Sequence, residues 1–195
     1  MGGFDVNAAQ WRDSELSRKA QKTVQNHVGE FHQKVLGAVV DWEDLGTGEN
    51  VDLRNTKRRI IAEVKNKHNT VKGDSKYHVY DDLDDLISLK ASRYYNYSAY
   101  FVTIIPLKSK KNSVYPFVPS VKGTGKRRPK NDNINVIDGH SFYELVTGRP
   151  NALAELYAVL PTVIENVLIK IGAAHTFTAA DNATLNDYFA KAFKS

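Results

Sequence analysis

Apolar residues recur along the chain with two different periods, which predicts both helices and strands. Spacings of three and four predict amphipathic helices at residues 14–40, 76–93, 141–147, 151–171 and 180–193. Alternating or short apolar runs predict strands at residues 51–53, 59–65, 99–105, 114–121 and 134–137. Because the two kinds of segment interleave, the pattern predicts an α/β fold whose central mixed β-sheet is flanked by helices.

Some of these segments carry signals about their place in the sheet. The run 99–105 is almost wholly apolar, so we expect a central strand. Pro116 and Pro119 interrupt 114–121, which is typical of an edge or irregular strand. The turn at 54–57 lies between two short strands, which predicts a β-hairpin.

Composition narrows the class of protein. A chain of 195 residues is expected to form one domain, residues 1–195. A 10% aromatic content argues against wholesale disorder, and the absence of cysteine excludes disulfides and thiolate sites. The sequence shows no uninterrupted apolar run of about 18 residues and no signal peptide, so we expect a soluble cytoplasmic protein with no membrane partner.

Charge is distributed unevenly. The net charge is +5, and the stretch 108–130 is rich in Lys and Arg without a single Asp or Glu. Such a segment lowers the cost of approaching phosphates. A solvated loop that merely aids solubility explains the same charges equally well.

The predicted hairpin carries the residues best suited to chemistry. Glu63 and Lys65 are two apart on a strand, so they point to one face, and the hairpin can bring Asp52 toward Glu63. Two carboxylates at one point can share Mg²⁺, and a neighbouring lysine can stabilise charge on a phosphorane oxygen or position an attacking water. About two acid-x-Lys triplets are expected by chance, and Asp74 begins another, so a surface strand with ordinary ion pairing remains the alternative.

Several strings of this sequence resemble a known family. Asp52 with Glu63-x-Lys65 is similar to the PD-(D/E)xK nuclease superfamily, with Val51 where that superfamily often has proline. The resemblance to one group of type II restriction endonucleases, which cut GGNCC and GGWCC sites, spans roughly residues 28–148. It is carried by residues 29–33, 42–46, 52–53, 61–70 and 136–148. The chain is short at its N-terminus for this group, so we expect an N-terminal piece to be absent or reduced.

The resemblance implies a core of αβββαβ type and a set of roles. Asp52 and Glu63 would be catalytic metal ligands together with the Val64 carbonyl, and Lys65 would be the catalytic lysine. Glu30 matches a position where related nucleases place a further carboxylate, although an exposed helical glutamate explains it equally well. The reaction would be Mg²⁺-dependent hydrolysis of double-stranded DNA, with Mn²⁺ as a substitute, leaving a 5′-phosphate.

The same resemblance suggests which residues bind DNA. Two groups are expected near the DNA, one following the catalytic strand and one in the basic loop: Lys67, His68, Asn69 and Lys72, then Lys126, Arg127, Arg128, Lys130 and Asn131. Arg or Lys can donate to guanine in a GG step, whereas phosphate contact without base reading is the simpler role. A palindromic site would favour a homodimer, with a cognate DNA methyltransferase as functional partner.

Two other functions fit the same residues. One is a repair or recombination nuclease that reads DNA structure, and the other is a basic DNA-binding module whose carboxylates are structural.

Overall fold

The computed structural model describes most of the chain from residue 29 onward. The described residues are 11–12, 14–15, 18, 29–46, 48–71, 75–121, 123–170, 172 and 178–193. After a helical segment at residues 29–37, the elements are β1 (Glu43–Asp44), β2 (Leu53–Asn55), β3 (Ile60–Lys67), α2 (Lys76–Ser88), β4 (Ser98–Ile105), the 3₁₀ turn η2 (Lys108–Lys110), β5 (Val114–Pro116), β6 (Ile134–Asp138), α3 (Gly139–Thr147), α4 (Ala152–Lys170) and α5 (Ala179–Phe193). The predicted α/β class is confirmed.

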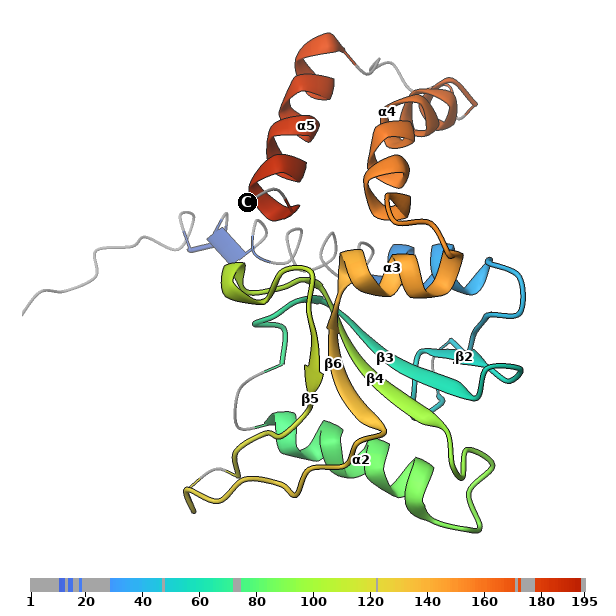
Figure 1. The fold of residues 1–195 in the computed structure, drawn as a ribbon. Helices are drawn as coiled ribbons and strands as arrows, with labels where there is room; N and C mark the ends of the chain where they lie inside the picture. The colour runs from blue at the N-terminus through green and yellow to red at the C-terminus, as the bar shows by residue number, and fades with distance from the viewer. Residues whose placement is uncertain are drawn as a thin grey trace, which may run out of the picture.

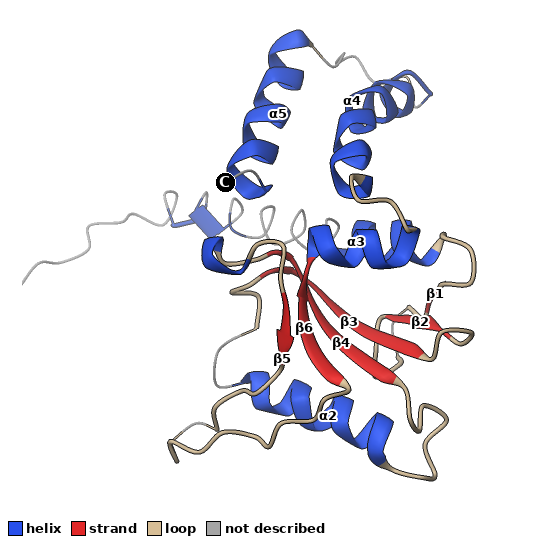
Figure 2. Ribbon diagram, in the orientation of Figure 1, coloured by secondary structure: helices blue, strands red, loops and turns tan. Residues whose placement is uncertain are grey.

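The strands form one six-stranded mixed sheet in the order β1-β2-β3-β4-β6-β5 (Figures 1 and 2). Its centre is parallel, with β4 between β3 and β6. The edges are antiparallel, because β1, β2 and β3 follow one another as a meander and β5 runs against β6. The carboxyl ends of three parallel strands therefore meet at one edge, a common position for ligands in α/β folds.

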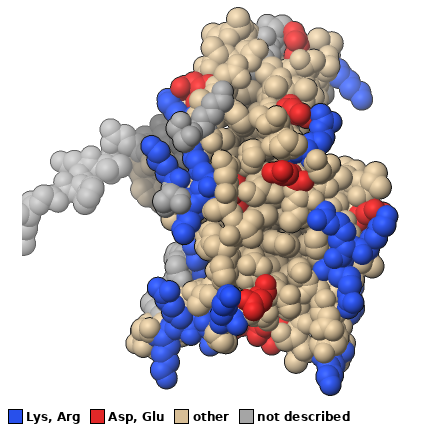
Figure 3. Space-filling model, viewed as in Figure 1, with Lys and Arg blue, Asp and Glu red and all other residues tan. Residues whose placement is uncertain are grey.

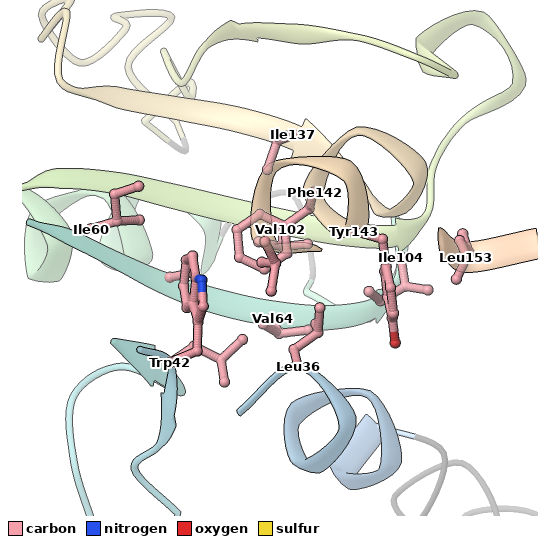
Figure 4. Packing of buried hydrophobic residues seen from close by; sticks show 13 residues of the cluster. Leu36, Trp42, Ile60, Val64, Val102, Ile104, Ile137, Phe142, Tyr143 and Leu153 are labelled. Atoms are coloured by element: carbon pink, nitrogen blue, oxygen red, sulfur yellow. The ribbon is translucent and has the colours of Figure 1, made fainter. Parts of the chain in front are cut away.

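Alternation along β3 separates two hydrophobic cores. Ile60, Ala62 and Val64 lie in one core, together with Leu36 from the helical segment 29–37. Figure 4 shows this core between the sheet and the helices that cover it. Ile61 points to the other face, where α2 covers the sheet (Figure 2). By the same alternation, Glu63 and Lys65 lie on the α2 face.

The strongest apolar patterns predicted their elements well. The run 99–105 is β4, central as expected, and the hairpin is confirmed by the antiparallel register of Leu53 with Ala62. The segment with two prolines is the edge strand β5, although it ends at Pro116. The last two predicted helices match α4 and α5 to within one residue at each end.

Several boundaries were wrong for local reasons. Helix α2 stops at Ser88 and not at residue 93, because the chain turns over 90–96 with Asn96 in the left-handed region. The first helix ends at Gly37, where an added Cβ would lie 2.5 Å from the Asp44 amide nitrogen, so β1 requires glycine there. Residues 11–12 and 14–15 are helical, so helical structure is present before the predicted start at residue 14, and most of residues 16–28 lie outside the described residues. The strand predicted at 51–53 is β2, shifted to begin at Leu53, so Asp52 lies just before it.

Helix α4 is the described segment that bears on the expectation about membranes. It is the one helix among the described residues long and apolar enough to cross a bilayer by length and composition alone. The sequence contains no uninterrupted apolar run, but glutamates at 155 and 165 are sparse enough to leave a mean hydropathy of 1.6 over an 18-residue window. Only Leu153 of this helix is buried. One such helix is weak evidence for a membrane span.

Candidate active site

The open end of the β2–β3 hairpin brings three predicted site residues together. The backbone N–H of Asp52 donates to the Ala62 carbonyl over 3.0 Å, which is the last rung before the strands separate. Beyond it the Val64 N–H donates to Asp52 Oδ2 over 2.6 Å. The Asp52 carboxylate therefore replaces the strand that would otherwise pair with β3 at this point.

Glu63 and Lys65 complete the group on the same face. The Lys65 ammonium forms an ion pair with Glu63 Oε1, and the two side chains are 25% and 18% exposed respectively. Glu63 also lies within reach of the Asp52 carboxylate, and each of the two affects the ionisation of the other. Two acids and one lysine thus share a small, partly enclosed volume.

Burial and mutual repulsion perturb both acids. Burial raises the pKa of Glu63, and the neighbouring Asp52 charge raises it further, while Lys65 opposes both effects. Burial also raises the pKa of Asp52, against the stabilising hydrogen bond from Val64. Two carboxylates that repel each other in a partly buried site are stabilised by a bound cation more strongly than by water.

Asp44 is a third acidic residue near the site that the sequence did not single out. Its negative charge adds to the rise in the pKa of Asp52, although burial is the largest cause. Asp44 lies in β1, and its Oδ1 accepts a hydrogen bond from the Gly46 N–H over 3.0 Å. The only sequence signal was a run of acids between Asp41 and Glu49.

The predicted helical carboxylate lies elsewhere. Glu30 is on the helical segment 29–37, whose Leu36 is buried against the opposite face of the sheet from Glu63. The Glu30 carboxylate is exposed and lies 4.0 Å from the Lys34 ammonium, one helical turn on. The first helix thus presents Glu30 to solvent from the other side of the sheet.

A cavity of about 400 Å³ lies on the α2 face of the sheet, lined by residues of β4 and β6 and not by Asp52, Glu63 or Lys65. Thr103 of β4 is the cross-strand neighbour of Lys65, and Asp138 of β6 is the cross-strand neighbour of Thr103. Since Thr103 and Asp138 both line the cavity, it starts one strand away from Lys65. Aromatic side chains form part of its wall, among them Phe101 stacked on Phe117 with centroids 5.0 Å apart. Four basic side chains also line it: His68, Lys76, Lys110 and Arg127.

The predicted DNA contacts after β3 lie close to this cavity. His68 lines it, and the buried His68 Nδ1 has no hydrogen-bond partner among the described residues. Lys67 and Asn69 are exposed at the end of β3, where the Lys67 N–H donates to Thr70 Oγ1 over 3.2 Å. Lys72 lies outside the described residues.

The basic loop divides into two groups. Arg128 forms an ion pair with Asp81 of α2, and Asn131 Nδ2 donates to Asp84 Oδ1 over 2.7 Å. Lys130 pairs with Asp132 at 2.6 Å. Lys126 and Arg127 are instead exposed, at a tight turn where the Val121 N–H donates to the Lys126 carbonyl.

These contacts decide which loop residues are free to meet a ligand and which are bound to α2. Arg128 and Asn131 fasten the loop to α2, whereas Lys126 and Arg127 present their charge to solvent. Figure 3 shows Lys and Arg side chains gathered over the loop between β5 and β6, beside acids of α2. The acids at 81 and 84 therefore hold the loop in place while part of its positive charge stays accessible.

Three comparisons relate the chain to known proteins. The family described as Eco47II restriction endonuclease matches residues 1–169. The chain is 54% identical over 185 residues to the type II restriction enzyme Eco47II of Escherichia coli, covering 94% of this chain and 77% of that enzyme. It is 28% identical over 169 residues to the type II restriction enzyme Sau96I of Staphylococcus aureus, covering 85% and 63% respectively. No solved structure matches significantly.

The match extends over most of the chain and includes β2, β3 and the hairpin between them. The resemblance to type II restriction endonucleases is thereby confirmed, and the chain belongs to the Eco47II restriction endonuclease family.

Proposed function

We propose that this restriction endonuclease hydrolyses phosphodiester bonds of double-stranded DNA at a short palindromic site of GGNCC type, leaving 5′-phosphates. The observation that carries the proposal is the convergence of Asp52, Glu63 and Lys65 at the open end of the hairpin. The order helix, β1, β2, β3, α2, β4 agrees with the αβββαβ core of PD-(D/E)xK nucleases. A 54% identical relative is named as a type II restriction enzyme.

The donor set suits Mg²⁺, with Mn²⁺ as a substitute. Among the described residues no cluster of three or more His, Cys, Asp or Glu side chains could hold a metal. Mg²⁺ does not need one, because it keeps several waters and binds through one or two carboxylates plus substrate phosphate. Asp52 and Glu63 are two such carboxylates; burial raises the pKa of both, and a nearby cation would favour their charged forms.

The Val64 carbonyl fits as a third oxygen ligand. In a strand the N–H and C=O of one residue point to the same side. Since the Val64 N–H donates to Asp52, its carbonyl lies along the same edge of β3, which no longer pairs with β2 there. The bound cation would supply the charge that activates water and neutralises the phosphate.

Lys65 would supply a positive charge at the scissile phosphate, which neither carboxylate can provide. Its ammonium already lies in the group through its ion pair with Glu63. When Glu63 binds the cation, Lys65 can turn to the scissile phosphate and stabilise the negative charge that develops on its oxygens. In the same position it can orient the attacking water.

The strand to be cut would pass over the end of β3. His68, Lys67 and Arg127 surround this path from the strand and the basic loop, and Lys126 adds charge beside it. Arg128, Asn131 and Lys130 would act chiefly by shaping the loop. Asn69 and Lys72 stay proposed phosphate contacts, whereas the position of Glu30 across the sheet from Glu63 does not support an accessory role for its carboxylate.

The biological setting follows from the family. A palindromic site calls for two catalytic centres, so we propose a homodimer in the prokaryotic cytoplasm. A cognate DNA methyltransferase would protect the host sites as a functional partner.

The direct test is digestion of a sequenced plasmid by the purified chain with Mg²⁺. Discrete fragments with 5′-phosphate ends at GGNCC-type sites are expected, and Lys65→Ala should abolish cutting while DNA binding persists. Lys57→Ala is the matched control, because Lys57 lies at the exposed turn of the same hairpin and pairs with Asp41. A smear would support the nuclease that reads DNA structure, and equal behaviour in EDTA and Mg²⁺ would support the non-catalytic module.

A further inference from the structure

The cavity of about 400 Å³ on the α2 face has a floor that is partly aromatic and partly polar. Phe101 and Phe117 are stacked, with ring centroids 5.0 Å apart and planes 10° from parallel. The half-buried Tyr115 adds a third ring to the lining. Thr103 and Asp138 lie near the carboxyl ends of the parallel strands β4 and β6. Ligands of α/β folds commonly bind outside the carboxyl ends of such strands.

The buried carboxylate of Asp138 keeps some capacity to accept a hydrogen bond. Its Oδ1 accepts from the Ser141 N–H over 3.1 Å, and its Oδ2 accepts from the Ser141 hydroxyl over 2.9 Å and from the Ser113 N–H. A carboxylate has about four acceptor positions, so these bonds leave one for a ligand. Burial raises the pKa of Tyr115, and the negative charge of Asp138 raises it further, which places the carboxylate close to the aromatic part of the lining.

Positive charge surrounds the opening of the cavity. Lys76, Lys110 and Arg127 reach it from three separate segments, which are α2, η2 and the basic loop. None of these three forms an ion pair with an acid in the part of the chain that the structure describes. The Lys110 ammonium lies over the Tyr115 ring instead, 4.5 Å from its centroid. Arg127 and Lys110 are exposed, so their charge is available to an anion at the opening.

The floor and the opening together fit one chemical class of ligand. Inorganic phosphate would use the cations but leave the aromatic floor without a contact. An apolar molecule would use the rings but leave the Asp138 carboxylate and the cations unmatched. A nucleotide uses both, because its base stacks on aromatic rings, its base amino group donates to a carboxylate, and its phosphate binds cations. The cavity is also within the range of small-molecule sites, about 300–1,000 Å³.

We propose that this cavity binds a single nucleotide, with the base on the aromatic floor beside Asp138 and the phosphate at Arg127 and Lys110. The inference deepens the proposed function and rests on it for the source of the nucleotide. Thr103 is the cross-strand neighbour of Lys65, and adjacent strands lie about 4.8 Å apart, so a nucleotide bound here lies beside the lysine assigned to the scissile phosphate. One source is a nucleotide of the bound DNA turned out of the base stack, and the other is a free nucleotide.

The first test is saturation-transfer NMR of dAMP with the full chain, without DNA or Mg²⁺. The base protons H8 and H2 should receive more saturation than the sugar H5′ protons, because the base lies inside the cavity. Ribose 5-phosphate has the phosphate but no base, so it should compete with dAMP at least tenfold more weakly than unlabelled dCMP does. Equal competition by ribose 5-phosphate, or no binding of dAMP, would overturn the proposal.

Two variants separate the base from the phosphate. Arg127→Ala should weaken dAMP about tenfold and leave deoxyadenosine, which lacks the phosphate, unchanged. Tyr115→Leu should weaken both ligands, because it removes a ring from the lining. Lys90→Ala is the matched control, since Lys90 is an exposed lysine that does not line the cavity. Circular dichroism checks that each variant is folded. A Tyr115→Leu chain that is folded and binds both ligands as the wild type does would overturn the proposal, as would equal losses in Lys90→Ala and Arg127→Ala.

A fluorescent duplex distinguishes the two sources. The Lys65→Ala chain is mixed with Mg²⁺ and a duplex that carries 2-aminopurine at the centre of a GGNCC-type site. Stacking in the duplex quenches 2-aminopurine, so a rise in fluorescence that Tyr115→Leu removes identifies the bound DNA as the source. Binding of dAMP without any such rise supports a site for a free nucleotide.

The two proposals can fail separately. A chain that cuts plasmid at discrete sites but does not bind dAMP contradicts the nucleotide cavity alone. A chain that binds dAMP with its base inside the cavity but never cuts plasmid contradicts the proposed function alone.

Discussion

The buried histidine at position 32 should make the stability of the fold depend on pH. His32 has no exposed surface, and its Nδ1 lies 2.8 Å from the Tyr143 hydroxyl oxygen. Its Nε2 is buried without a hydrogen-bond partner among the described residues. Burial lowers the pKa of His32 from 6.5 to about 4, because a charged imidazolium would lose its hydration there.

The sign and size follow from linkage between protonation and folding. As the pH falls below about 6.5, His32 becomes protonated in the unfolded chain, whereas in the folded chain it stays neutral until about pH 4. Stability is therefore fully present above pH 6.5 and is lost across this window. The full loss is about 3 kcal/mol, of which about 2 kcal/mol falls between pH 7 and pH 5.

The assay is urea unfolding at pH 7 and pH 5, followed by the fluorescence of Trp42, which is buried in the same core as Tyr143. His32→Gln is the comparison, since an amide can still hydrogen-bond Tyr143 but does not titrate. Asp52 and Glu63 have raised pKa values and change stability in the opposite direction, but they are present in both proteins and cancel. Parallel pH profiles for the two proteins would refute the reasoning.

Two further perturbations test the packing of α3 and the function of the basic loop. Gly139→Ala should destabilise the fold by about 1–3 kcal/mol in urea unfolding, because its Cβ would lie 2.5 Å from the Ile104 carbonyl oxygen. Gly29→Ala, which meets nothing within 4 Å, should not lower stability, and equal losses in the two variants would contradict this account. Arg127→Ala should lower the slope of log affinity for DNA against log salt by about one without changing the melting temperature. Arg128→Ala and Asp81→Asn should both lower the melting temperature, because they break the ion pair that fastens the loop to α2. An unchanged melting temperature in both would show that the pair does not hold the loop.

The candidate site could be predicted because its members are close in sequence. Glu63 and Lys65 share a strand face by alternation, and a turn of a few residues brings Asp52 beside them. A hairpin is a local structure, so its register follows from the turn and the apolar pattern. The same locality explains why β4, a continuous apolar run, was predicted almost to the residue.

Long-range contacts explain what the pattern missed. Strand β1 has two exposed residues and no apolar periodicity. It forms because it pairs antiparallel with Leu53 and Arg54 of β2. Asp44 reaches the site only through that pairing. The cavity beside Lys65 likewise depends on the parallel register that aligns Thr103 and Asp138, residues 35 apart in the chain.

The sequence by itself determined the α/β class, the hairpin with its acids and lysine, and the presence of a basic loop, because these depend on local periodicity and composition. Only the tertiary structure decided which charges are available: it places Arg128 against Asp81 and leaves Arg127 exposed. It also places Glu30 on the far side of the sheet from Glu63. Helix α4 is the clearest case, since an apolar helix read alone predicts burial, and only the packing of its neighbours shows which face remains open.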